Sequence, residues 1–245
     1  MLIGDSHTAS TPEFGGTLQN NLSISRNGTS CDRNVSGSCA PVSRCALGST
    51  TAYSILQMSD TDRLFRQNPS AVVIALGTND AGWMCDETDV TKGRWPSIRN
   101  LIRKVPPGKP CFWVGPPNFP ANSSVMRTCR SHYTTFIQTL RRIVTENNCT
   151  FIDSTQMKMV TAQNPQNPCT EGTAPLAPNL PEDPLHPHGI VAQNWAKCSA
   201  QQIRQALQNR SGIRPSNTTG PQTSPNPTAR GSVLILRPSR ETGRP

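Results

Sequence analysis

The 245-residue sequence is poor in aromatic residues and lacks any long apolar run. Phe, Trp and Tyr make up 5% of the chain and hydrophobic residues 34%, which predicts a modest core. No apolar run approaches the roughly 20 residues that a membrane-spanning helix needs, so we expect no transmembrane segment. A signal peptide is not recognised either, because Met1-Leu2-Ile3 enters a strand directly, without a basic region or a long apolar stretch.

Patterns typical of nucleic-acid-binding and zinc-binding proteins are missing as well. The formal net charge is +9, but five arginines and one glutamate lie in residues 211–245, and no stripe of Lys and Arg interleaved with aromatic residues appears. The nine cysteines form no CxxC pair and no Cys/His cluster with the spacing of zinc ligands. We therefore expect neither a nucleic-acid partner nor a bound metal.

The cysteine content is nevertheless high for a cytosolic enzyme of this size. Cys31, Cys39 and Cys45 lie in a stretch rich in Ser, Asn and Gly, where a disulfide could substitute for hydrophobic packing. The cysteines predict a disulfide framework in a secreted or periplasmic protein, with at least one thiol unpaired or paired between chains. The alternative is a reduced protein in which they pack as small hydrophobic side chains. The other cysteines are Cys85, Cys111, Cys129, Cys149, Cys169 and Cys198.

Short apolar segments alternate with segments of helical periodicity, which is typical of α/β proteins. Strands are predicted at residues 1–4, 71–76, 111–114 and 150–153. Amphipathic helices are predicted around Phe14–Leu22, Ile98–Val105, Tyr133–Val144 and Ile190–Leu207. Because the strands are continuous apolar runs, we expect a parallel sheet covered by helices on both faces. Residues 1–210 should form this single domain.

The remaining residues, 211–245, have a different composition. They hold six prolines and many Ser, Thr and Asn residues, and Val233–Leu236 is their only apolar run. So little apolar surface does not offset the entropy lost on ordering, which predicts a disordered tail. Docking of Val233–Leu236 as an edge strand is the alternative.

Polar, chemically capable loops follow three of the four predicted strands. They are Gly4-Asp5-Ser6-His7, Gly77-Thr78-Asn79-Asp80 and Gly115-Pro116-Pro117-Asn118. Ligands of open α/β sheets bind at the carboxyl ends of the strands, so these loops predict an enzyme.

Ser6 is the candidate nucleophile, because it stands between a strand and a helix whose N-terminal amides favour negative charge. The alternative for an isolated serine at this place is a helix cap. Its base must be one of four histidines, which are His7, His132, His186 and His188. We favour His186, because Asp183 three residues earlier can accept its Nδ1–H; His188 is the runner-up.

Hydrolysis by a serine also needs hydrogen-bond donors for the oxyanion. Asn79, after the strongest predicted strand, can supply a side-chain amide, Gly48 a backbone N–H, and Ser6 its own N–H. Taken alone, Asn79 and Gly48 are equally compatible with ordinary turns.

Together these motifs resemble the SGNH (GDSL-type) hydrolases. Gly4-Asp5-Ser6, a loop glycine at Gly48, Gly77-Thr78-Asn79-Asp80 and Asp183-x-x-His186 occur in that family's order, over residues 1 to about 205. The resemblance implies a flavodoxin-like three-layer α/β/α sandwich with a central parallel sheet. It implies Ser6, Asp183 and His186 as catalytic residues and Ser6, Gly48 and Asn79 as the oxyanion hole. No metal or organic cofactor is required by this chemistry.

Two features depart from the family pattern. His7 follows the serine, where many relatives carry a different side chain, and it could shape the pocket. The long stretch 20–50, with its three cysteines, leaves Gly37 as a weaker candidate for the oxyanion glycine.

The sequence says less about the substrate than about the reaction. Family members act on acetylated polysaccharides, peptidoglycan, lipids and thioesters. Trp83, Trp95 and Trp113 lie in or near strand-end loops, where they could stack on sugar rings or simply pack. We expect a serine esterase that removes O-acetyl groups from a carbohydrate or cell-wall polymer. The alternatives are a short-chain lipid or aryl esterase, an acyltransferase, and a non-catalytic carbohydrate-binding domain.

Overall fold

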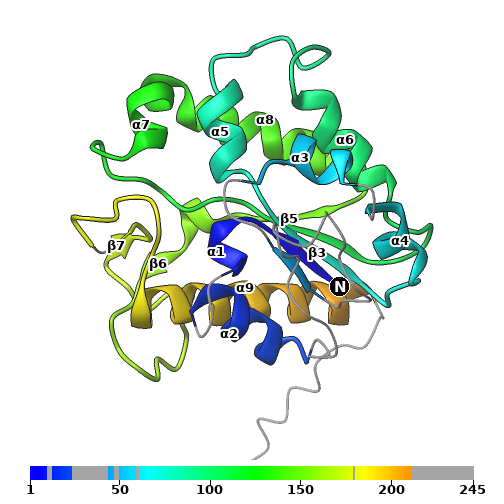
Figure 1. Ribbon diagram of the computed structural model, residues 1–245. Coiled ribbons are helices and arrows are strands. Elements are labelled where there is room, and N and C mark those ends of the chain that lie inside the picture. The colour runs from blue at the N-terminus through cyan, green and yellow to red at the C-terminus, as the bar shows by residue number, and fades with distance from the viewer. Residues whose placement is uncertain (10–12, 24–43, 47–49, 59–60, 179, 211–245) are drawn as a thin grey trace, which may run out of the picture. The chain divides into compact units, whose positions relative to one another are not determined.

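The computed structural model describes residues 1–9, 13–23, 44–46, 50–58, 61–178 and 180–210 (Figure 1). These residues all belong to one unit, Met1–Ile213. The predicted tail 211–245 lies outside the described residues, as do the candidate glycines Gly37 and Gly48. The same holds for Cys31, for Cys39 and for the side chain of Cys45.

Five parallel strands form the central sheet, in the order β2-β1-β3-β4-β5. They are β1 (Leu2–Gly4), β2 (Arg44–Ala46), β3 (Val72–Ala75), β4 (Cys111–Val114) and β5 (Thr150–Ile152). Leu2 pairs with Arg44 on one side and with Val73 on the other, so β1 lies between β2 and β3. This is the flavodoxin-like strand order, and the predicted fold class is confirmed. The strand β2 was missed, because it is short and carries no apolar run.

Helices cover both faces of the sheet and complete three layers (Figure 1). On one face lie α2 (Phe14–Asn21) and α9 (Gly189–Arg210), and on the other α3 (Ala52–Gln57), α6 (Trp95–Arg103) and α8 (Tyr133–Glu146). The shorter elements are α1 (Ser6–Ala9), α4 (Thr61–Arg66), α5 (Thr78–Met84), α7 (Ser124–Cys129), η1 (Arg130–His132) and η2 (Ser154–Gln156), with a separate antiparallel pair β6 (Lys158–Met159) and β7 (Ala174–Pro175). Among the described helices, none is long and apolar enough to cross a membrane.

Successive residues of each strand point to opposite faces of the sheet and build two cores. Ile3 and Ile74 pack with α6 and α8 in the first core. Leu2 and Val73 pack with α2 and α9 in the second. Because both faces are covered, the strands need apolar residues at consecutive positions, which explains the uninterrupted apolar runs in the sequence.

Disulfides join three pairs of the described cysteines, namely Cys85–Cys129, Cys111–Cys149 and Cys169–Cys198. They connect the end of α5 to α7, the start of β4 to the turn before β5, and the loop after β6 to α9. The predicted disulfide framework is therefore present, with a connectivity that the sequence alone did not provide.

Candidate active site

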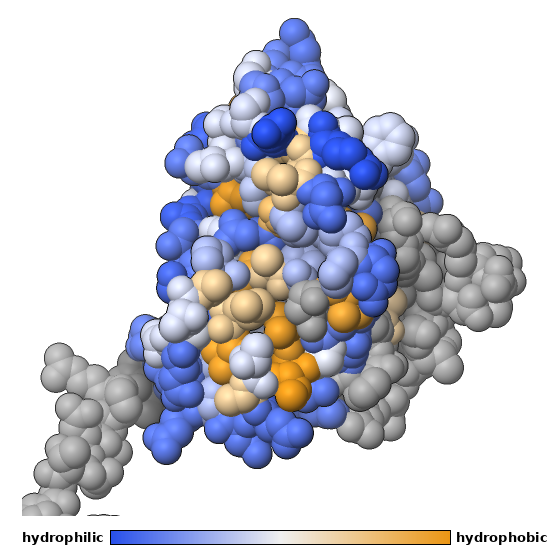
Figure 2. Space-filling view, turned by 90° about the vertical axis from the view of Figure 1, so that its left-hand side faces the viewer, coloured by the Kyte–Doolittle hydropathy of each residue, from blue (hydrophilic) through white to orange (hydrophobic). Residues whose placement is uncertain are grey.

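Ser6 lies at the carboxyl end of β1, in the turn where the strand becomes α1. The Asp5 carbonyl holds this turn by accepting the N–H groups of Thr8 and Ala9. A Cβ at Gly4 would lie 2.0 Å from Thr8 Oγ1, so this close approach requires glycine. The turn therefore presents the serine at the carboxyl end of the sheet. The face of the molecule at this end of the sheet is turned toward the viewer in Figure 2 and shows apolar surface between polar margins.

Ser6, His186 and Asp183 form a continuous line of hydrogen bonds. Ser6 Oγ is 2.8 Å from His186 Nε2, although the two residues are 180 positions apart. On the other side of the ring, His186 Nδ1 is 3.0 Å from each carboxylate oxygen of Asp183. With Nδ1–H donating to Asp183, Nε2 can accept the serine proton. The structure thus brings together the three residues that the sequence predicts as nucleophile, base and orienting carboxylate.

The Asp183 carboxylate also shapes the loop that carries His186. Its Oδ1 accepts the backbone N–H groups of Leu185 at 3.2 Å and His186 at 3.1 Å. Burial favours the neutral acid, but hydrogen bonds from His188 and His186 outweigh it and lower the pKa of Asp183 to about 2. Asp183 is therefore ionised at neutral pH, where it can stabilise a positive charge on His186.

His188, the alternative base, contacts the Asp183 carboxylate rather than Ser6. Its Nε2 is 2.7 Å from Asp183 Oδ2 and its Nδ1 is 3.3 Å from Glu13 Oε1. Burial opposes protonation, but the hydrogen bonds and charges of these two carboxylates outweigh it and raise the pKa of His188. Sequence reasoning missed Glu13, because no local spacing connects it to a loop 175 positions away.

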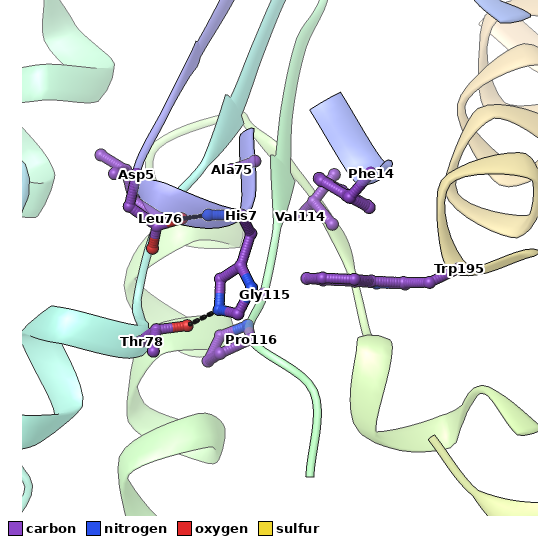
Figure 3. Close-up of a pocket in the computed structure, with 10 residues that line it drawn as sticks. All are labelled: Asp5, His7, Phe14, Ala75, Leu76, Thr78, Val114, Gly115, Pro116 and Trp195. Atoms are coloured by element: carbon purple, nitrogen blue, oxygen red, sulfur yellow. Dashed lines mark hydrogen bonds between the residues drawn. The ribbon is translucent and has the colours of Figure 1, made fainter. Parts of the chain in front are cut away.

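His7 points into the interior of the domain (Figure 3). Its Nε2 is 3.0 Å from Thr78 Oγ1, and its ring centre is 4.7 Å from that of His186. Burial, followed by the charge of His186, lowers the pKa of His7 to about 3, so the ring is neutral at neutral pH. His7 lines a cavity of about 10 Å³, near the size needed for one water molecule, whose wall includes Asp5 and Trp195.

Asn79 stands in the first turn of α5, directly after β3. Gly77 precedes this helix with a φ of 132°, a conformation that favours glycine, and a Cβ there would lie 2.8 Å from Pro116 Cδ. Asn79 Nδ2 donates to the Thr50 carbonyl at 3.2 Å, and the amide carries a second N–H. The hydrogen bond between Thr78 and His7 joins this turn of α5 to the loop of Ser6.

Two buried carboxyl groups, Asp5 and Asp80, lie behind these turns. Asp5 accepts the His7 N–H and Asp80 accepts the Ala52 N–H, both at 3.1 Å. Burial outweighs these hydrogen bonds and raises the pKa of Asp5 to about 8 and that of Asp80 to about 7. Both groups were missed as titrating residues, because their burial is not visible in the sequence.

The three tryptophans near the strand ends differ in exposure. Trp95 and Trp113 are buried, and their Nε1–H groups donate to the carbonyls of Glu87 and Leu76. The structure therefore contradicts sugar stacking at Trp95 and Trp113, which are packing residues. Trp83 is 68% exposed.

The fold and this site define a class of protein. Within the described residues, no group of three or more His, Cys, Asp and Glu side chains is placed to hold a metal ion. A parallel sheet between two helical layers, with Ser6, His186 and Asp183 aligned at its carboxyl end, is the architecture of a flavodoxin-like serine hydrolase. The chain belongs to the GDSL-like lipase/acylhydrolase family, whose sequence model matches residues 2–190.

Chains of several solved structures match this one over most of its length. A catalytic mutant of the acetylxylan esterase Axe2 from Geobacillus stearothermophilus is 15% identical, with a TM-score of 0.47 over 82% of this chain and 92% of that one. A GDSL-like lipase from Bacteroides thetaiotaomicron is 16% identical, with a TM-score of 0.48 over 84% and 87%. The catalytic domain of peptidoglycan O-acetyltransferase A from Streptococcus pneumoniae is 16% identical, with a TM-score of 0.44 over 86% and 93%. A search of curated proteins finds no match.

Proposed function

We propose that the protein is a serine esterase that works through an acyl-enzyme, with Ser6 as nucleophile, His186 as base and Asp183 as its orienting carboxylate. The observation that carries the proposal is the 2.8 Å contact of Ser6 Oγ with His186 Nε2, in line with the bonds from His186 to Asp183. Membership in a family of lipases and acylhydrolases supports it. A domain that only bound a ligand would not need these three groups in line.

The reaction follows from these positions. His186 takes the Ser6 proton as Oγ attacks the ester carbonyl, and the ionised Asp183 stabilises the imidazolium. His186 then gives the proton to the leaving alcohol. Water repeats the sequence on the acyl-enzyme, which releases the acid and restores Ser6.

His7 assists the proton transfer by remaining neutral. A positive His7, with its ring centre 4.7 Å from that of His186, would repel the imidazolium that forms during catalysis. Burial keeps His7 uncharged, and its hydrogen bond to Thr78 holds the ring in place. His186 therefore gains its proton without a like charge beside it.

For the oxyanion we propose three donors, which are the backbone N–H groups of Ser6 and Gly48 and the side-chain amide of Asn79. The place of Asn79 in the turn that Thr78 joins to His7 supports its role. Gly48 lies outside the described residues, so its part in the proposal rests on the sequence.

As substrate we propose an O-acetyl ester on a carbohydrate or cell-wall polymer. The three disulfides support a secreted or periplasmic protein, which would meet such polymers.

The test is hydrolysis of a short-chain aryl acetate by wild type, Ser6→Ala and His186→Ala, with acetate release from acetylated xylan and peptidoglycan measured in parallel. We expect Ser6→Ala and His186→Ala to lose at least about 10³-fold in kcat. His132→Ala, which changes an exposed histidine in η1, is the matched control and should retain activity.

The faster polymer identifies the substrate class. Full activity of a correctly folded Ser6→Ala protein would refute the nucleophile. Transfer of acetyl to a sugar in place of hydrolysis would identify an acyltransferase, and glycan binding without turnover by wild type would identify a binding domain.

A further inference from the structure

Three side chains from separate elements form an exposed stack on the surface. Trp83 of α5 is 68% exposed and Tyr53 of α3 is 45% exposed. The guanidinium carbon of Arg94, the residue before α6, lies 4.4 Å from the Trp83 ring centre and 5.4 Å from that of Tyr53. Cation–π contacts with both rings hold the three side chains together. We call Tyr53, Trp83 and Arg94 the aromatic platform.

The helix α5 connects the platform to the proposed catalytic residues. Asn79 and Trp83 are four positions apart on this helix, so their side chains lie on the same face, about one turn from each other. At the start of α5, Thr78 is hydrogen-bonded to His7, the neighbour of Ser6. A ligand that rests on Trp83 therefore extends toward Asn79 and the ester-binding end of the site.

The underlying elements are tied together, which gives the platform a defined geometry. Asp80 on α5 accepts the N–H of Ala52, the residue before Tyr53. Asn79 on α5 also bonds the Thr50 carbonyl in the segment leading into α3. The first turns of α3 and α5 thus stay in register, and the rings above them are presented in a fixed arrangement.

The chemistry of the platform suits a sugar ring. Tyr53 and Trp83 are the large hydrophobic side chains that stand exposed among the described residues, and both rings contact the same guanidinium. The guanidinium of Arg94 carries five N–H donors in a planar fork, which suits hydrogen bonds to the hydroxyl oxygens of a ligand. A pyranose offers C–H groups on its face for the aromatic rings and hydroxyl oxygens at its edge for the guanidinium.

We infer that the aromatic platform binds a sugar ring of the acetylated glycan and thereby directs the acetyl ester toward Ser6. The ring stacks on Trp83, and Arg94 donates to its hydroxyl oxygens. The inference rests on the proposed esterase function and specifies its substrate, because a small aryl acetate has no second ring to reach the platform.

The kinetic test compares Trp83→Ala with Trp83→Phe on phenyl acetate, acetylated xylotriose and an O-acetylated peptidoglycan disaccharide. We expect Trp83→Ala to lower kcat/KM about tenfold on the hydrolysed glycan, mainly through KM, and to leave phenyl acetate hydrolysis unchanged. Trp83→Phe keeps an aromatic face and should recover most of the loss. Arg94→Ala should lower kcat/KM on the glycan. Arg103→Ala, at the other end of α6, is the matched control and should leave it unchanged.

Three kinetic outcomes would overturn the inference while the esterase proposal stands. They are an unchanged glycan reaction in Trp83→Ala, an equal loss on phenyl acetate and glycan, and a wild type that hydrolyses phenyl acetate but neither glycan. A wild type without activity on any ester would remove the esterase proposal instead.

A binding measurement tests the platform even if the wild type hydrolyses no ester. Tryptophan fluorescence of Ser6→Ala, titrated with xylotriose and with the unacetylated disaccharide, should report binding of one of them. Adding Trp83→Ala should weaken this binding about tenfold, measured by calorimetry, whether or not the protein turns over an ester. Equal affinity with and without Trp83, or no binding at all, would refute the platform.

Discussion

Replacement of Asp80 by asparagine should change how the stability of the protein depends on pH. The Asp80 side chain is 0% exposed, its Oδ1 accepts the Ala52 N–H, and its Oδ2 has no hydrogen-bond partner among the described residues. Burial raises its pKa from 3.8 to about 7, against the hydrogen bond from Ala52 and the charge of Arg94. An asparagine keeps the acceptor for Ala52 and cannot ionise.

The sign and size of the effect follow from this pKa. Below about pH 4 the carboxyl is neutral in the folded and unfolded states, and its contribution to stability is fully present. As pH rises toward 7, the unfolded carboxyl ionises while the folded one stays protonated, so the contribution is lost at about 1.4 kcal/mol per pH unit. Over the three units to pH 7 the loss is of the order of 4 kcal/mol, and Asp80→Asn should not show it.

The assay is denaturant unfolding of wild type and Asp80→Asn at intervals between pH 4 and pH 8. Other groups titrate in both proteins, so the difference between the two unfolding free energies reports Asp80 together with its effect on Asp5, whose pKa the charge of Asp80 helps to raise. Asp86→Asn, which alters an exposed carboxyl shortly after α5, is the control for the loss of one negative charge. A difference between wild type and Asp80→Asn that stays constant from pH 4 to pH 7 would refute a neutral buried carboxyl.

Three further outcomes are expected. Asn79→Ala removes a proposed oxyanion donor and should lower kcat on aryl acetates by about 10²–10³-fold with little change in KM. Steady-state kinetics measures both constants, and an unaltered kcat would exclude that role. His188→Ala removes one charge-assisted hydrogen bond to Asp183 and should lower kcat about tenfold, and His188→Gln should recover part of this loss. The pH–rate profiles of both variants test whether the loss of kcat is confined to the pH range where His188 is protonated. Replacing Cys111 and Cys149 by alanine should cost about 4 kcal/mol of stability, because their disulfide closes a loop of 38 positions, and unchanged thermal unfolding would contradict this.

Four strands of the sheet could be predicted from their continuous apolar runs, and the long helices could be predicted because their apolar residues recur at regular intervals. In α8, Phe136, Leu140 and Val144 are spaced four apart and all are buried. The helices α1, α3 and α5 have four, six and seven residues, too few to show a period. Contacts from other elements hold these short helices in place, such as the hydrogen bond from the Ala52 N–H to Asp80 at the start of α3. Contacts between distant parts of the chain cannot be predicted from a local sequence pattern.

In the candidate site, too, residues in local patterns could be predicted, and contacts between distant elements could not. Asp183 and His186 could be found because the chain brings them together within one loop, and Ser6 because it directly follows a strand. The contact of His188 with Glu13 could not, since it depends on how α2 and α9 meet. Nor could the sequence separate the exposed Trp83 from the buried tryptophans, because exposure is decided by what packs above each ring.

The 180 positions between Ser6 and His186 have a consequence for biosynthesis and for engineering. In the proposed mechanism, Ser6 is inactive until the loop that carries His186 has been synthesised and has folded beside it. Residues 161–164 are exposed and lie between Ser6 and His186 in the sequence. Cleavage there would leave the proposed nucleophile and its base on different fragments, and we expect neither fragment to be active alone. If the proposed esterase function holds, two such fragments fused to interacting proteins should hydrolyse esters only when they are brought together, and the chain could then serve as a complementation reporter.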